Sequence, residues 1–126
     1  MNNKIIINSL LLCLLLGLPG CSEDSANRHL RLGNWYVQKG LLEEAVLEFR
    51  EVIRLISPHH QKITKEEFIM LGSAHYNLAL VYTKKGWWDF ALKEAEASFA
   101  LQPTENHYEL VQIIKQGEGF SKQTSE

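Results

Sequence analysis

Five histidines are the residues of this chain that could bind a metal ion. His59 and His60 are adjacent, but no Cys, Asp or Glu stands beside them at a spacing typical of metal ligands. His29 and His75 lie 46 positions apart and occupy equivalent places in a repeated pattern. Helices that pack side by side are separated by about 8–10 Å, so these two imidazoles should be too far apart to share an ion. We predict no metal site and no cofactor.

Two pairs of adjacent carboxylates, Glu43-Glu44 and Glu66-Glu67, are the other groups that could do chemistry. Both stand at expected helix starts, where negative charge suits the helix dipole, so we interpret them as solvated residues and not as an acid/base pair. The chain has no Gly-rich phosphate loop, no HExxH motif and no serine nucleophile elbow. Its formal net charge is −2 and no basic stripe is present. The sequence predicts neither an enzyme nor a nucleic-acid-binding protein.

The first 21 residues have the pattern of an export signal. A single lysine precedes an apolar run from Ile5 to Leu18, which Asn8, Ser9 and Gly17 interrupt. The run is shorter than the about 20 apolar residues of a comfortable membrane span, and its length and flanks fit the apolar region of a signal peptide. We therefore expect residues 1–20 to be a signal peptide.

Residues 18–21, Leu-Pro-Gly-Cys, resemble the bacterial lipobox. The resemblance implies cleavage before Cys21 and acylation of its thiol, with Cys13 lost in the signal peptide. Residues 21–25 would then form a short lipidated tether. Ser22 stands where an aspartate would suggest retention in the inner membrane, so the inner leaflet of the outer membrane is favoured if the bacterium is Gram-negative. The alternatives are an ordinary secretory signal or an uncleaved anchor with a chance cysteine.

A repeat follows the tether. Residues 28–56 and 74–102 align without a gap and share eight identities, which fall at a turn and on two buried stripes. In each unit a glycine, Gly40 or Gly86, ends one apolar helical pattern, and an alanine opens the buried face of the next. The sequence therefore predicts two antiparallel helix hairpins.

The boundaries of the expected helices follow from capping and breaking residues. Thr64 to Glu67 has the form of a capping box, which predicts one long helix from about Lys65 to Lys85 after a loop at 58–63. Gly72 inside this helix allows a bend. The other helices are expected to run from about residue 26 to Gly40, from 43 to 56, from the Trp87-Trp88 turn to Pro103, and from 105 to 116. We expect Gly117 to stop the last helix and residues 117–126 to form a flexible tail.

The stretch from His75 to Pro103 resembles a tetratricopeptide repeat (TPR) unit, whose pattern is Trp, Leu-Gly, Tyr, Ala, an aromatic residue and Pro. Histidine stands in the Trp position of both units, and we interpret its ring as a flat amphipathic substitute. Ala79 replaces the Gly of the second unit and Ala95 the aromatic residue. The resemblance covers residues 26–116. It implies an all-α fold of two TPR-like antiparallel helix hairpins plus a C-terminal capping helix, which together make a short α-solenoid.

TPR proteins commonly bind peptides on the concave face that the first helices of their hairpins form. By that resemblance the groove residues here are Arg31, Asn34, Gln38, Asn77, Leu80 and Lys84, with Thr83 beside them and with His107 and Val111 beyond. Asn34 and Asn77 match the asparagines that grip the peptide backbone in the carboxylate-clamp class. The basic residues of that clamp are missing, so the resemblance implies a generic peptide groove.

The resemblance implies a membrane-anchored protein–protein interaction module of the bacterial cell envelope, which serves as an assembly or scaffold factor. The alternative is a self-associating structural protomer with no peptide ligand, because two repeats leave apolar ends exposed. Trp88 is expected in the core. Trp87 is expected at the surface, where it could contact a partner or the lipid interface.

Overall fold

The computed structural model describes residues 21–57 and 62–123, and the predicted signal peptide lies outside them. All elements in these two ranges are helices, as predicted. They are α2 (Cys21–Gln38), α3 (Leu42–Ile56), α4 (Lys65–Lys84), α5 (Trp88–Leu101) and α6 (Glu105–Gln123).

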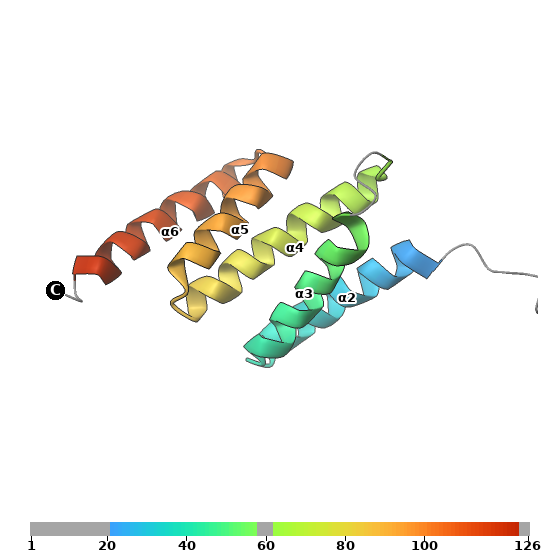
Figure 1. The fold of residues 1–126 in the computed structure, drawn as a ribbon, viewed down its shortest axis with the longest axis horizontal. Helices are drawn as coiled ribbons and strands as arrows, with labels where there is room; N and C mark the ends of the chain where they lie inside the picture. Colours follow the sequence, from blue (N-terminus) through green and yellow to red (C-terminus); the bar gives the residue numbers. More distant parts are fainter. Residues whose placement is uncertain (1–20, 58–61, 124–126) are drawn as a thin grey trace, which may run out of the picture.

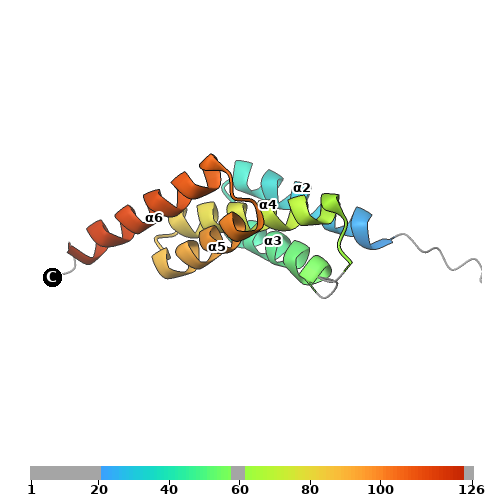
Figure 2. The same ribbon diagram turned by 90° about the horizontal axis from the view of Figure 1, so that it is seen from above.

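The helices form two antiparallel hairpins and a terminal helix (Figure 1). α2 packs against α3 and α4 packs against α5, while α4 also joins the two hairpins through contacts with α2 and α3. α6 packs against α5. Seen from above, α3 and α5 lie on the opposite side of the molecule from α2 and α6, with α4 between them (Figure 2). The predicted short solenoid of stacked hairpins is confirmed.

Both hairpin turns depend on a glycine with left-handed backbone geometry. Gly40 has a φ of 73° and Gly86 has a φ of 71°. In the first turn the N–H of Leu41 donates to the carbonyl of Tyr36 at 2.9 Å, and the second turn repeats this bond one repeat later at the same length. This is a Schellman motif, which satisfies carbonyls left free at a helix end. The predicted turn positions are confirmed.

All five helices contribute side chains to the core. The buried face of α3 consists of Ala45, Val46, Phe49, Val52 and Ile56, and Ile53 beside it is half-buried. Gly33 on α2 faces α3, because a Cβ added at Gly33 would lie 2.5 Å from the Phe49 ring. The equivalent Ala79 on α4 is completely buried. Small residues at these two positions allow the helices of each hairpin to approach closely.

The capping box at the start of α4 is confirmed. The Thr64 N–H donates to the Glu67 carboxylate at 2.7 Å, and the Glu67 N–H donates to the Thr64 hydroxyl at 3.1 Å. Gly72 farther along α4 has a packing role. A Cβ there would lie 2.7 Å from the Gln102 amide, and the carbonyl of Gly72 accepts a bond from the Ser98 hydroxyl at 2.9 Å. The glycine therefore lets the end of α5 approach α4.

The expected stop of the last helix at Gly117 is wrong. α6 continues through Gly117 to Gln123, and only residues 124–126 of the expected tail lie outside the described residues. The reason is a tertiary contact, since a Cβ at position 117 would lie 2.5 Å from the ring of Trp88. Gly117 makes room for this half-buried ring, which packs against the core as expected.

The start of the first helix also differs from the prediction. α2 begins at Cys21, so residues 21–25, the expected tether, are part of this helix. No glycine or proline lies between Cys21 and Ala26, and Ala26 is already 1% exposed within the core. The helix therefore has a packed turn from which to extend toward its N-terminus.

Among the described helices, none combines the length and the apolar composition that a membrane span requires.

Candidate functional site

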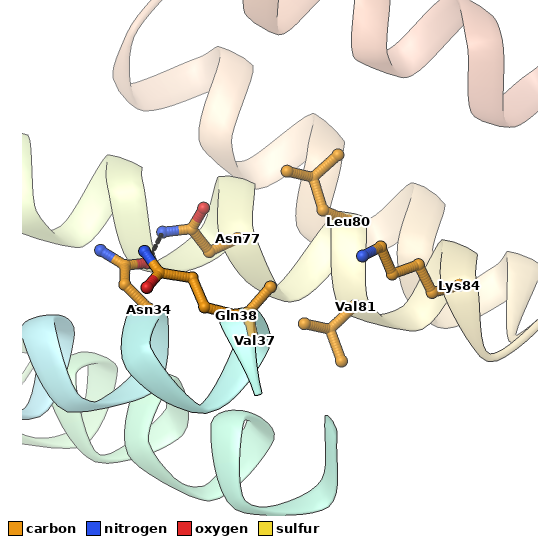
Figure 3. Close-up of a pocket in the computed structure, with 7 residues that line it drawn as sticks. All are labelled: Asn34, Val37, Gln38, Asn77, Leu80, Val81 and Lys84. Carbon is orange, nitrogen blue, oxygen red and sulfur yellow. Dashed lines mark hydrogen bonds between the residues drawn. The ribbon is translucent and has the colours of Figure 1, made fainter. Parts of the chain in front are cut away.

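A groove between α2 and α4 contains a cavity of about 340 Å³ (Figure 3). α2 supplies one wall and α4 the other, and the lining residues are Asn34, Val37, Gln38, Asn77, Leu80, Val81 and Lys84. Five of these were predicted from the sequence. Val37 and Val81 were not predicted, and these two apolar side chains form the floor.

Arg31 does not line this cavity. It lies on α2 one turn before Asn34, with an exposed side chain. The predicted extension of the groove onto α6 is wrong. Val111 is 5% exposed within the core. His107 stacks on Tyr76 with ring centroids 4.9 Å apart.

Two asparagines connect the walls of the groove. The Asn77 side-chain N–H donates to the Asn34 side-chain oxygen at 3.0 Å, so α2 and α4 are joined by an amide pair. Asn34 is exposed and Asn77 is half-buried. Each amide keeps hydrogen-bonding capacity after this bond, because Asn34 retains its NH₂ donors and Asn77 retains its carbonyl acceptor. The pair can therefore offer a donor and an acceptor, fixed side by side, to a third amide group.

The floor of the groove is apolar and its charge is positive. Val81 is 1% exposed and Val37 is half-buried, while Leu80 stands at the rim with 37% of its surface exposed. Lys84 makes no ion pair or hydrogen bond within the part of the chain that the structure describes. Figure 3 shows Gln38 directed toward the two asparagines and Lys84 at the other end. Residues 26–38 and 77–84 contain no acidic residue, so the groove favours a ligand with negative charge.

Each hairpin also contains a histidine–glutamate pair. His29 Nδ1 lies 2.5 Å from Glu48 Oε2, and His75 Nδ1 lies 2.6 Å from Glu94 Oε2. The pairs join the first and second helix of each hairpin, and all four side chains are mostly buried. These pairs were not predicted from the sequence. The repetition of these residues in the sequence could have indicated the pairs, because both the His and the Glu positions are among the eight identities of the repeat.

Neither these pairs nor His107 belongs to a metal-binding cluster among the described residues. No group of three or more His, Cys, Asp or Glu side chains with the geometry of a metal site occurs in residues 21–57 and 62–123. His59 and His60 lie outside the described residues.

Ser98 and His107 form a hydrogen-bonded pair that has the composition of a nucleophile and its base. Their side chains are 3.0 Å apart. Ser98 is fully buried, and its hydroxyl donates to the carbonyl of Gly72 at 2.9 Å. The proton between Ser98 and His107 must therefore come from the imidazole, which is the reverse of what activation of a serine requires. No substrate can reach this hydroxyl, and the pair connects α4, α5 and α6 as a structural contact.

Trp87 is exposed as predicted, with 47% of its surface accessible. Its ring stacks on Tyr82 with a centroid distance of 5.8 Å, and the Lys85 ammonium lies 4.2 Å from the Trp87 ring centroid. Lys85 also forms an ion pair with Glu43 of the first hairpin. The turn that contains Trp87 lies at the end of the hairpins opposite to the Cys21 end of α2 (Figure 1).

Comparisons with known proteins identify no relative: no family model, curated protein or solved structure matches this chain.

Proposed function

We propose that this protein is a membrane-anchored interaction module whose α2–α4 groove binds an extended peptide segment of a partner protein. The observation that carries this proposal is the Asn34–Asn77 pair above the apolar floor. A peptide backbone offers N–H and C=O groups that complement the free acceptor and donors of this pair. An apolar side chain of the peptide would cover Val37 and Val81. The TPR resemblance supports the same surface.

The charge of the groove defines the peptide further. Arg31 and Lys84 lie within residues 26–38 and 77–84, and neither of these stretches contains an acidic residue. The ligand that fits is a segment with at least one apolar side chain and one carboxylate, the carboxylate being placed to approach Lys84.

Binding should decrease when both asparagines are replaced. Asn34→Ala combined with Asn77→Ala is expected to weaken binding of the partner by roughly 1–3 kcal/mol, because the two amides lose their bonds to the peptide. The variants would be compared by co-purification of the full chain from its own membranes, followed by titration with a synthetic peptide of the captured segment. Circular dichroism checks the fold. If Trp87→Ala abolishes binding while the double alanine variant binds normally, the functional surface is the turn and the groove proposal is wrong.

The anchor is the second part of the proposal and depends on Cys21. Because α2 begins at Cys21, Asn34 would stand about 20 Å along the helix from an acylated cysteine, at about 1.5 Å per residue. An acylated Cys21 would thus keep the groove close to the bilayer surface of the envelope.

The processing of the chain tests this anchor. Cys21→Ala should leave an uncleaved or unacylated precursor, and Cys13→Ala should be processed normally. The intact mass of the membrane-extracted protein distinguishes these products. Normal processing of the Cys21 variant, with its release into the soluble fraction, would contradict the lipoprotein proposal.

Self-association is the alternative function, and the exposed apolar side chains of α6 favour it. Tyr108 is 51% exposed and Ile113 is 59% exposed, on the terminal helix of the stack. A second copy could cover them, as neighbouring repeats do in longer solenoids. Sedimentation of the full chain in detergent distinguishes the two functions. A dimer that Ile113→Lys dissociates would favour the protomer, whereas a monomer would favour the peptide groove.

A further inference from the structure

A second groove has its walls on α3 and α5 and part of its floor on α4. Figure 1 shows α4 running between these two helices. Its cavity measures about 560 Å³ and shares no residue with the α2–α4 groove. The lining residues are Leu47, Arg50, Glu51, Ile53 and Arg54 from α3, His75 and Leu78 from α4, and Lys93 and Glu94 from α5. The function proposed above does not use this surface.

The floor of the α3–α5 groove is apolar. Leu78 is 1% exposed and Ile53 is half-buried, and both continue into the core. Leu47 at the rim is 67% exposed, which makes it the most exposed large apolar side chain among the described residues. A ligand that covered Leu47 and reached Ile53 would remove apolar surface from water.

The acidic residues of this groove already have partners. Glu51 accepts a hydrogen bond from Arg54 Nε at 2.8 Å, and this hydrogen bond holds the pKa of the Glu51 carboxyl below its usual value. Glu94 lies 2.6 Å from the imidazole of His75. Both carboxylates are therefore occupied by groups of the groove itself.

Two basic residues of the groove have no such partner. Arg50 on α3 and Lys93 on α5 are exposed, and neither makes an ion pair or hydrogen bond within residues 21–57 and 62–123. Asp89 stands one turn before Lys93 but does not come within ion-pair distance. Glu96 forms an ion pair with Lys115 instead, with 3.3 Å between Glu96 Oε1 and Lys115 Nζ. The two walls thus carry one uncompensated positive charge each, above an apolar floor.

We propose that the α3–α5 groove is a docking site for an acidic amphipathic helix of a partner protein. A helix laid between α3 and α5 would place its apolar face on Leu47, Ile53 and Leu78, as helices do when they bind in grooves. Carboxylates at the edges of that face would pair with Arg50 and Lys93. Charge complementarity favours this occupant, because the walls carry the positive charges of Arg50 and Lys93. The site is separate from the α2–α4 groove and lies on the other side of α4.

A designed peptide tests the proposal directly. The probe is a fluorescein-labelled synthetic amphipathic helix of leucine, alanine and glutamate, and its matched analogue carries glutamine in place of every glutamate. Fluorescence anisotropy with the full chain in neutral detergent measures both affinities. The glutamate peptide should bind about tenfold more tightly than the glutamine peptide, since two rim ion pairs of modest strength distinguish them. Equal affinities would overturn the proposal.

Charge reversal shows whether the peptide occupies this groove. Arg50→Glu with Lys93→Glu should abolish the preference for the glutamate peptide, and a lysine-containing version of the peptide should bind this variant more tightly than it binds the unaltered chain. The control is Lys62→Glu with Lys65→Glu, which makes the same change in charge at exposed positions away from the groove. Equal losses in the two variants would mean that net charge alone controls binding, which would also overturn the proposal. Circular dichroism verifies that each variant is folded.

The α2–α4 groove must be excluded as the binding site. Asn34→Ala with Asn77→Ala should leave the affinity for the glutamate peptide unchanged. If this variant loses affinity while the Arg50 and Lys93 variant retains it, the acidic helix binds the α2–α4 groove and the inference about the α3–α5 groove is wrong.

Discussion

Replacing Gly117 with alanine tests the contact between α6 and Trp88. A Cβ at position 117 would lie 2.5 Å from Cζ3 and 2.7 Å from Cη2 of the indole, well inside normal contact distance. The ring is rigid, so either α6 or Trp88 must move. Overpacking of this kind costs about 1–3 kcal/mol, and the higher helix propensity of alanine offsets about 1 kcal/mol of that. We expect Gly117→Ala to lower the free energy of unfolding by up to about 2 kcal/mol.

Gly119 provides a matched control in the same helix. It is exposed, and no atom lies within 4 Å of a Cβ added there. Gly119→Ala gains helix propensity without a clash, so it should raise the free energy of unfolding by up to about 1 kcal/mol. Two identical substitutions two residues apart are therefore expected to change stability in opposite directions.

Urea unfolding of the full chain, followed by far-UV circular dichroism, measures both effects. In a Trp88→Leu background the Gly117→Ala penalty should disappear, because the atoms that the new methyl group meets are gone. A Gly117→Ala variant as stable as Gly119→Ala would refute the reasoning and would return residues after Gln116 to the status of a loose tail.

Three further predictions concern the hairpins. Gly86→Val should lower the free energy of unfolding by about 1–2 kcal/mol through backbone strain alone, since its φ is 71° and no atom lies within 4 Å of an added Cβ; a loss near zero in urea unfolding would contradict the turn geometry. A double-mutant cycle of His75→Ala and Glu94→Ala should give a coupling of about 0.5–1.5 kcal/mol in the same assay, and additive effects would show that the pair contributes nothing. Burial raises the pKa of the Tyr82 phenol, so its contribution to stability is complete below the unfolded pKa of about 10 and is lost as pH rises through the folded pKa. Tyr82→Phe should therefore lose less stability between about pH 9 and about pH 11 than the unaltered chain does, and equal losses would contradict this.

Features that depend on neighbours in the chain could be predicted from the sequence. The capping box at Thr64 and the glycine turns at Gly40 and Gly86 involve residues at most five positions apart, and the structure has them as expected. The shared groove residues were also predictable, because the repeat places Asn34 and Asn77 on first helices that face the same side.

Features that depend on distant parts of the chain could not be predicted in this way. Gly117 has the pattern of a helix stop, and only the position of the Trp88 ring shows that it is a close contact. The hydrogen bond from the Asn77 side chain to the Asn34 side chain likewise depends on the distance between the two hairpins. The pair of His75 and Glu94 was an intermediate case, since its repetition was visible in the sequence but its contact was not.

A site-specific photo-crosslinker in the α2–α4 groove is the most direct test of the central claim. The crosslinking amino acid would replace Leu80, which lines the groove, and in a second chain Ile69, which is 48% exposed on the same helix but outside the groove. Irradiation of the full chain in its native cells, with mass spectrometry of the adducts, identifies the bound segment. We predict that the Leu80 position captures a defined peptide segment with an apolar side chain and a carboxylate, that Asn34→Ala with Asn77→Ala reduces this capture, and that the Ile69 position does not capture it. Equal capture at both positions, or capture at Leu80 that the asparagine variant does not change, would contradict the account.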